Sequence, residues 1–584
     1  MSFYIKRARR FFPLLILLLT IAATGLCTTF FSINLTEDEK FETFTDKLFK
    51  AELSDNTLTL HYTLASPKDF AISQTQTSLG RISTDKTSYY TQCEEYENTL
   101  NQFQYSELSE QNQLTLDTLL LYFHTARSLG DNYLLEEYLS PSLGIQAQLP
   151  VLLAEYTFRT QQDIIDYFKL LQDIKPYFQS ILDFEKVKSE AGFFMNDESL
   201  NRIQEQCRSF IQNPDSNYML QIFSDKLDAF SSISAEEKKE LLTLHEKLLK
   251  NEVIPAYENL ISGLEALRGT GKNPGGLSNF SGGQDYYLYL LQSNCGIYTT
   301  IPTLEYRLTR QLLNDCQRIN SLLEKNPDLL NDYQNLEDTS LAQPEQMLQA
   351  LLDYIRQDFP EPTATDYAIS YVHESMEEYL SPAFYLTPPL DTGSPNNIYL
   401  NRSRLPSSLD LFTTLAHEGF PGHLYQTTYF SAQNPLPIRA LFSCSGYVEG
   451  WATYVESYAY QYAADYFDCD TNLTTLAQLN RNVNLCLYSL LDIGIHYHSW
   501  TEAQAGTFLV NFGITNDAVL HDIYLYIVEN PANYLQYYVS YLNFMDLKSA
   551  QQEALGNTFD LQTFHKKILE IGPVPFPILA KYIN

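Results

Sequence analysis

The chain has 584 residues, of which 44% are hydrophobic and 14% aromatic, so it has ample apolar material for a large packed core. This composition excludes wholesale disorder. A formal net charge of −33 argues against nucleic acid and against an anionic membrane surface as partners of the folded part.

The first 33 residues depart from this acidic character. Four basic residues between positions 6 and 10 precede an apolar run that continues to about residue 33. The pattern is typical of a cleaved signal peptide, and the run is also long enough to remain as an N-terminal membrane anchor. Cys27 follows Leu26, whereas a lipid-attachment motif has a small residue at that place. We therefore expect residues 34–584 to work outside the cytoplasm, either secreted or anchored at the cell surface.

After this leader, apolar residues recur with a helical period of about 3.6 residues almost to the end of the chain. A Ser-x-x-Glu capping box at Ser234 opens one helix, and Pro255 predicts a kink inside it. Without internal repeats or low-complexity linkers, residues 34–584 are predicted to form one mainly α-helical domain, with the loop at 269–283 as a candidate hinge. The predicted helices include 106–128, 161–184, 200–212, 235–268, 302–324, 344–357 and 365–379.

One short region favours extended structure. Residues 383–390 lead through a Gly-Ser-Pro turn to 397–401, where polar and apolar residues alternate as in a strand. An edge strand beside a metal can hold an extended peptide by pairing with its backbone. Asn397, Tyr399 and Asn401 are therefore candidate substrate-binding residues. A structural hairpin that covers the core explains the same pattern.

A histidine-glutamate pair with a second histidine downstream indicates metal chemistry. His417 and Glu418 are adjacent, and His423 follows within the segment 415–426, L-A-H-E-G-F-P-G-H-L-Y-Q. In zinc hydrolases, neutral imidazoles hold the ion and the adjacent carboxylate takes a proton from the metal-bound water. We therefore predict one Zn²⁺ ion, with the two histidines as ligands and Glu418 as general base.

The spacing of these histidines needs a break in the helix. Six residues separate them, against four in H-E-x-x-H, and six steps would leave them about 120° apart on an ideal helix. Pro421 removes a backbone donor and disrupts the helix, so residues 420–422 are predicted to loop out. That would return the second histidine to its H-E-x-x-H position. The helix itself is predicted to start near Ser407, with Asp410 in a capping position.

A third ligand is expected on a later helix. Residues 446–460 place Glu449 and Glu456 seven residues apart, on one face that is otherwise apolar and aromatic. Carboxylates are costly there unless a cation or a hydrogen-bond donor meets them. Glu449 is our predicted ligand, with Glu456 as its supporting partner or as the alternative ligand. A buried salt bridge would also explain the pair.

Two further groups are candidates for polarising a substrate carbonyl. His496 follows Asp492 by four residues, so the carboxylate could fix the tautomer of the imidazole. A core histidine hydrogen-bonded inside the protein is the alternative. A tyrosine could instead donate to the oxyanion, although a stripe of tyrosines often only packs. The candidates lie on one helix and are Tyr534, Tyr537, Tyr538 and Tyr541.

Together these motifs resemble the bacterial domain-of-unknown-function family 885, a set of predicted zinc metallopeptidases. The resemblance covers nearly all of the chain from about residue 37 onwards. Its motifs are H-E-G-F-P-G-H at 417–423, E-G-W-A-T-Y-V-E at 449–456, D-I-G-I-H-Y at 492–497, P-A-N-Y-L-Q-Y-Y at 531–538 and the closing segment 559–575.

This resemblance implies a mainly helical fold similar to the gluzincin zinc peptidases. The metal ligands would match His417, His423 and Glu449, and the general base would match Glu418. It also favours Tyr537 among the tyrosines, together with His496. The chain departs from the family where Tyr538 replaces a common lysine and where P-G-Q becomes P-A-N at 531–533.

We therefore predict an exported zinc metallopeptidase that hydrolyses peptide bonds, with a peptide as its substrate. The alternatives are a zinc amidase or esterase acting on other substrates, and a non-catalytic protein that binds peptides or cell wall. A nucleic-acid partner is not expected, and contact with a membrane would come only from an uncleaved N-terminal segment. The sequence leaves the oligomeric state open.

Overall fold

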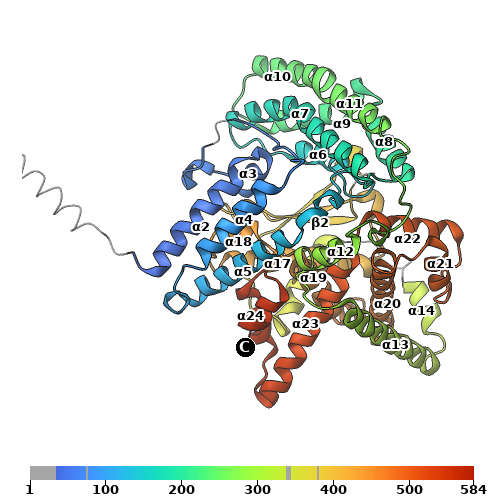
Figure 1. The fold of residues 1–584 in the computed structure, drawn as a ribbon. Helices are drawn as coiled ribbons and strands as arrows, with labels where there is room; N and C mark the ends of the chain where they lie inside the picture. The colour runs from blue at the N-terminus through green and yellow to red at the C-terminus, as the bar shows by residue number, and fades with distance from the viewer. Residues whose placement is uncertain (1–34, 74–75, 337–342, 378–379, 584) are drawn as a thin grey trace, which may run out of the picture.

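The computed structural model of the chain describes residues 35–73, 76–336, 343–377 and 380–583. The predicted leader at 1–33 lies outside these residues. The fold is mainly α-helical, as predicted, with one small sheet (Figure 1). The helices of the first half are α2 (Glu37–Ser54), α3 (Thr57–Thr63), α4 (Thr87–Leu100), α5 (Glu110–Ser128), α6 (Ile145–Glu155), α7 (Gln161–Ala191), α8 (Asp197–Ile211), α9 (Tyr218–Ala229), α10 (Ala235–Leu248), α11 (Ile254–Glu265), α12 (Gly283–Ser293) and α13 (Ile301–Lys325).

The second half holds the sheet and the helices that surround the site. Its strands are β1 (Ala368–Tyr371), β2 (Ala383–Leu386) and β3 (Asn397–Leu400). Its helices are α14 (Leu329–Leu336), α15 (Pro344–Tyr354), α16 (Ser408–Glu418), α17 (His423–Ser431), α18 (Ile438–Leu441), α19 (Ser445–Tyr466), α20 (Thr471–His496), α21 (Glu502–Val510), α22 (Asp517–Glu529), α23 (Asn533–Leu555), α24 (Leu561–Ile571) and α25 (Phe576–Tyr582).

Three groups of helices surround the sheet (Figure 1). Helices α6–α11 pack around their own hydrophobic cluster at the top of the view. Helices α2–α5 form a second cluster on the left, which α18 joins. The largest cluster lies below and combines the sheet with α12, α13, α15–α17, α19, α20 and α23–α25. Strand β2 lies between the upper and lower groups, so it can form part of a site between them.

Most predicted helices are confirmed, with local differences. The capping box at Ser234 opens α10, and the kink predicted at Pro255 takes the form of a π-helical turn over Leu249–Val253 before α11. Such a turn accommodates a residue that lacks a backbone N–H. The helix predicted at 365–379 is wrong, because β1 and a short 3₁₀ turn occupy this segment.

The sheet has the strand order β1-β3-β2. β1 pairs with β3 in parallel, with Ala368 opposite Asn397, and β2 pairs with β3 antiparallel, with Tyr385 opposite Ile398. β3 is therefore bonded on both sides, and β2 is an edge strand. Edge strands keep one row of backbone donors and acceptors available for other partners.

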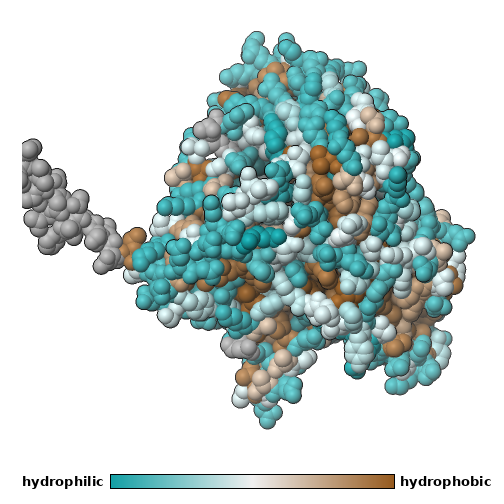
Figure 2. All heavy atoms as spheres, in the orientation of Figure 1, coloured by the Kyte–Doolittle hydropathy of each residue, from teal (hydrophilic) through white to brown (hydrophobic). Residues whose placement is uncertain are grey.

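The surface agrees with the composition of the chain. The face drawn in Figure 2 is largely hydrophilic, and hydrophobic residues form scattered patches on it. Within the described ranges, no helix is long and apolar enough to cross a membrane. The seven cysteines in these ranges are all free.

Candidate metal centre

The helix that carries the two histidines is interrupted between them, as predicted. α16 ends at Glu418 and α17 begins at His423. The N–H of Tyr425 donates to the carbonyl of Gly419 at 3.2 Å, so this hydrogen bond spans six residues, where a regular α-helix spans four. Helical hydrogen bonding thus resumes after two extra residues, and the rings of His417 and His423 come to 4.7 Å between centroids.

Two features hold this turn in place. The indole Nε1 of Trp451 in α19 donates to the carbonyl of Pro421 at 3.0 Å. A Cβ atom on Gly422 would lie 1.8 Å from the carbonyl oxygen of His417, so a side chain cannot fit there. Trp451 follows Glu449 by two residues. The helix that supplies the carboxylate therefore also fixes the turn between the histidines.

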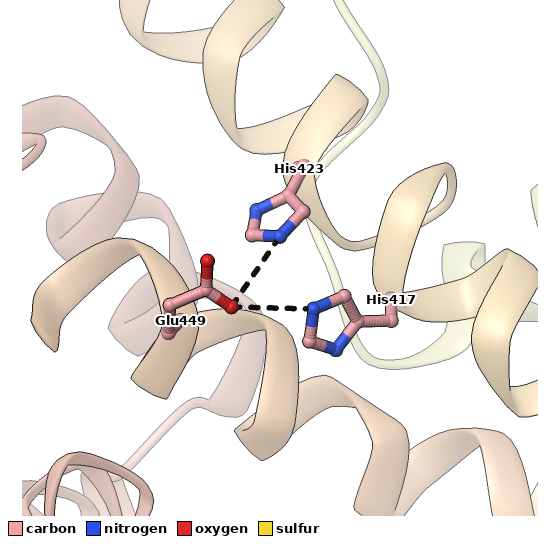
Figure 3. Close-up of side chains that lie close together, drawn as sticks. All are labelled: His417, His423 and Glu449. Atoms are coloured by element: carbon pink, nitrogen blue, oxygen red, sulfur yellow. Dashed lines mark ion pairs between the residues drawn. The ribbon is translucent and has the colours of Figure 1, made fainter. Parts of the chain in front are cut away.

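The side chains of His417, His423 and Glu449 point towards one another from α16, α17 and α19 (Figure 3). Oε2 of Glu449 lies 3.4 Å from Nε2 of His417 and 3.7 Å from Nε2 of His423. The ligand atoms lie within 4.8 Å of one another, and the described residues contain no other such group of His, Cys, Asp or Glu. The side chains are 12%, 14% and 24% exposed, so solvent reaches the centre. Two imidazoles and a carboxylate are the protein ligands of many catalytic zinc sites, so these residues fit a zinc ion.

Glu456 lies behind His417, on the side away from Glu449. Its Oε1 accepts a hydrogen bond from Nδ1 of His417 at 2.7 Å, and Nε of Arg481 in α20 donates to its Oε2 at 3.2 Å. A carboxylate at the far nitrogen fixes the tautomer and orientation of a ligand histidine. Nδ1 of His423, by contrast, is buried and has no hydrogen-bond partner among the described residues. The geometry favours Glu449 over Glu456 as the third ligand.

Glu418 is held by the sheet. The backbone N–H of Tyr385 in β2 donates to Oε2 of Glu418 at 2.9 Å. Burial raises the pKa of Glu418 to about 7, although the charge of His417 and the Tyr385 N–H act to lower it. A carboxylate with a pKa near neutrality can both take up and return a proton at physiological pH.

In the absence of a metal ion, one proton belongs to His417. Burial acts to lower its pKa, but the hydrogen bonds with Glu449 and Glu456 outweigh burial and raise the pKa to about 10. Burial and the charge of His417 lower the pKa of His423 to about 4, so this ring is neutral. The pKa of Glu449 is lowered, because its interactions with the two histidines outweigh burial. The two carboxylates therefore surround a single positive charge, which a bound cation would replace.

Among the four candidate tyrosines of α23, the surroundings of Tyr537 suit it best as the donor to an oxyanion. Burial and then the negative charge of Glu449 raise the pKa of Tyr537, and the charge of Glu418 adds to the effect. Its phenol has no hydrogen-bond partner among the described residues, whereas buried Tyr538 donates to Asp315 at 3.5 Å. Tyr537 therefore lies within electrostatic reach of the centre with its hydroxyl group available.

The catalytic role predicted for His496 is wrong. The side chain is fully buried, and both ring nitrogens are engaged by distant backbone groups. Nδ1 accepts from the N–H of Leu277 at 3.2 Å, and Nε2 donates to the carbonyl of Ile527 at 2.7 Å. No donor atom of the ring remains for a substrate, so His496 joins two segments of the core.

The predicted pairing of Asp492 with that histidine is wrong as well. Oδ1 of Asp492 accepts hydrogen bonds from the hydroxyl of Tyr287 at 2.6 Å and from the N–H of Ala532 at 3.0 Å. Ala532 immediately precedes α23 and has a φ of 64°, in the left-handed region. Asp492 therefore fixes the start of the helix that carries Tyr537.

The prediction that β3 binds substrate needs correction. β3 is paired on both sides, so no peptide can add to it. Asn401 is buried, and its amide donates to the carbonyls of Glu377 at 2.7 Å and Leu380 at 2.9 Å, which makes it structural. Asn397 and Tyr399 line a cavity beside the sheet, so a role in substrate binding stays a prediction for these two.

Three residues that support the centre were not predicted from the sequence: Trp451, Arg481 and Tyr385. Arg481 had a signal, because it is the only lysine or arginine between Arg439 and Lys548 and a buried Glu456 needs a cation. Trp451 belongs to the E-G-W-A motif and could have been connected with the turn. Tyr385 acts through its backbone, so its side chain carries no signal.

Comparisons with known proteins place the chain among bacterial proteins of unknown function. The family described as "bacterial protein of unknown function (DUF885)" matches residues 73–583. No curated protein matches the chain. A candidate lipoprotein from Colwellia psychrerythraea superimposes with a TM-score of 0.82 at 18% identity, over 94% of this chain and 99% of its own. A candidate lipoprotein of unknown function from Shewanella oneidensis has a TM-score of 0.65 at 15% identity, over 92% and 99%. At these identities the likeness shows the fold.

Proposed function

The chain belongs to the DUF885 family of bacterial proteins, and we propose that this member is a zinc-dependent peptidase of the gluzincin type that works outside the cytoplasm. The observation that carries the proposal is the convergence of His417, His423 and Glu449, with Glu418 beside them. Two contacts support these four residues. Glu456 orients one ligand, and the β2 backbone holds the base.

A zinc ion bound by these three residues would supply the Lewis acidity that polarises a peptide carbonyl and makes a water molecule more acidic. Glu418 would take the proton of the attacking water and return it to the leaving amine. Its Oε2 is fixed by the Tyr385 N–H, which leaves Oε1 for the proton transfer. Tyr537 is the candidate donor to the developing oxyanion, since its hydroxyl group is available.

β2 offers the edge along which a peptide substrate can extend. The Asn401 N–H donates to the carbonyl of Pro382, so Pro382 faces β3, and backbone groups alternate along a strand. Ala383 and Tyr385 therefore present their backbone groups to the opposite side, where Glu418 lies. A peptide added to this edge would bring a peptide bond near the proposed base.

A location outside the cytoplasm rests on two observations. The leader at 1–33 has the charge pattern of an export signal. Two solved structures that share the fold come from candidate lipoproteins.

The experiment is hydrolysis of a peptide library by residues 34–584, compared between wild type and Glu418→Gln. The amide keeps the size of the side chain and removes no proposed ligand, so zinc content should be unchanged. We expect the rate to fall by about 10²- to 10⁴-fold, as for loss of a general base. Loss of zinc in Glu418→Gln would instead make Glu418 a ligand.

The same experiment separates the alternatives. Cleavage of simple esters or amides with no cleavage of any peptide would favour an amidase or esterase. Binding of peptides with no hydrolysis of any substrate by the zinc-loaded protein would favour a non-catalytic binding protein.

A further inference from the structure

The chain that leaves β2 lines two neighbouring cavities. Residues 386–388 border both a cavity of about 630 Å³ and a second one of about 450 Å³. The first is lined mainly by apolar and tyrosine side chains and also contacts Tyr385. Because Tyr385 bonds to Glu418, the strand leads from the proposed base into the cavities. At about 3.3 Å per residue, Pro388 lies roughly 10 Å along the chain from Tyr385.

The second cavity, called here the basic cavity, contains two cationic side chains, Arg159 and Lys226. Lys226 in α9 donates to the carbonyls of Ala154 and Tyr156, the latter at 2.9 Å. Arg159 donates through Nη1 to the carbonyl of His61 at 3.0 Å. Neither forms an ion pair with a carboxylate of the described residues. Burial lowers the pKa of Lys226 to about 8, which reflects how far its charge is removed from water.

Unpaired cations are unusual in a chain with a net charge of −33. One acidic residue, Glu155, also lines the basic cavity, and its negative charge acts to raise the pKa of Lys226 against the effect of burial. Among the residues that line the cavity, two cations and one carboxylate leave one positive charge, while Asp163, outside the lining, accepts from the backbone N–H of Arg159 at 3.1 Å. A single additional carboxylate would balance it and would accept charge-assisted hydrogen bonds from Arg159 and Lys226.

We propose that the basic cavity binds a carboxylate group of the substrate, located two to four residues from the bond that is cleaved. This inference rests on the proposed function, because it takes β2 as the strand along which the substrate lies. It assigns the substrate class as peptides that carry an acidic group at this distance. Lys226 and Arg159 determine the specificity, and Asn397 and Tyr399 form part of the wall.

The carboxylate can come from an acidic side chain or from the C-terminus of the peptide. A peptide antiparallel to β2 directs its N-terminal side towards the cavity, so only a side chain can supply the group. A parallel peptide directs its C-terminal side there, and a free C-terminus can then serve. Four matched peptides separate the two sources: glutamate or glutamine three residues before the cleaved bond, and a free or an amidated C-terminus.

Within one of the two pairs, either glutamate against glutamine or free against amidated C-terminus, the wild-type protein should prefer the peptide with the carboxylate. Its kcat/KM should be about 10- to 100-fold above that of the neutral peptide, as expected for hydrogen bonds to a charged group. Lys226→Met and Arg159→Gln should each remove most of this preference. Equal cleavage of all four peptides by wild type would overturn the inference. The comparison of the four peptides uses only wild-type protein, so its result can be interpreted even if a substitution impairs folding.

Binding distinguishes a failure of this inference from a failure of the proposed function. The fluorescently labelled peptides are titrated against zinc-loaded wild type, Glu418→Gln and Lys226→Met. Preferential binding of a carboxylate peptide that Lys226→Met abolishes would support the basic cavity even if no peptide is cleaved. Cleavage without any preference, in binding or in rate, would reject the cavity and keep the peptidase.

Discussion

The role of Glu456 gives a quantitative prediction, because its contacts separate support of a ligand from direct metal binding. Glu456→Ala removes the acceptor that lies 2.7 Å from Nδ1 of His417. A hydrogen bond to a charged group contributes roughly 1.5–3 kcal/mol. At about 1.4 kcal/mol per tenfold, its loss should weaken zinc binding by about 10- to 100-fold. Glu449→Ala should remove most of the affinity, because it deletes a ligand.

The remaining partner of Glu456 should limit the effect on folding. The side chain of Arg481 is 43% exposed, so its charge can reach solvent when the carboxylate is removed. Glu456→Gln is the matched control, because the amide oxygen can still accept from His417, and it should cost less than about tenfold.

The assay is competition for zinc against a chromogenic chelator at constant pH, with circular dichroism to confirm that each variant is folded. A larger loss in Glu456→Ala than in Glu449→Ala would assign the third ligand to Glu456. Unchanged affinity in Glu456→Ala would refute the argument that this carboxylate orients His417.

Two further predictions concern protons and the turn between the histidines. Without metal, the pKa of His417 is about 10 and that of His423 about 4, so zinc binding near neutrality should displace one proton. Zinc affinity should therefore rise about tenfold per pH unit from about pH 6 to pH 8. Affinity that does not change with pH in chelator competition would contradict this prediction. Gly422→Ala should lower the free energy of unfolding by about 1–3 kcal/mol and weaken zinc binding, since the new Cβ meets the His417 carbonyl. The control is Gly506→Ala in α21, where the new Cβ would meet only Leu520, at 3.8 Å. In urea denaturation this substitution should be neutral or stabilising by up to about 1 kcal/mol. Similar effects of the two substitutions would refute the tight fit at Gly422.

Local sequence patterns were sufficient to predict those structural features that depend only on residues close together in the chain. The break between α16 and α17 followed from Pro421 and the spacing of the histidines, because a proline disrupts a helix whatever surrounds it. α16 begins beside Ser407, as predicted, but its N-cap is Ser407 and not Asp410, whose N–H donates to the Ser407 hydroxyl at 3.3 Å. Ala532 has a left-handed φ of 64°, a conformation that favours glycine.

Features that depend on distant segments could not be derived in this way. The partners of His496 come from Leu277 and Ile527, so its helix alone suggested a tautomer fixed by Asp492. The central place of β3 depends on β1, a segment whose periodicity favoured a helix. Tyr385 contributes a backbone N–H, which every residue except proline offers.

The metal centre is tested most directly by the zinc content of purified residues 34–584, measured by elemental analysis in wild type and in His423→Ala. We expect one zinc ion per wild-type chain and almost none in the variant, with both proteins folded by circular dichroism. Equal zinc content in the two proteins, or no zinc in wild type after incubation with the metal, would contradict the assignment of His417, His423 and Glu449 as the metal centre.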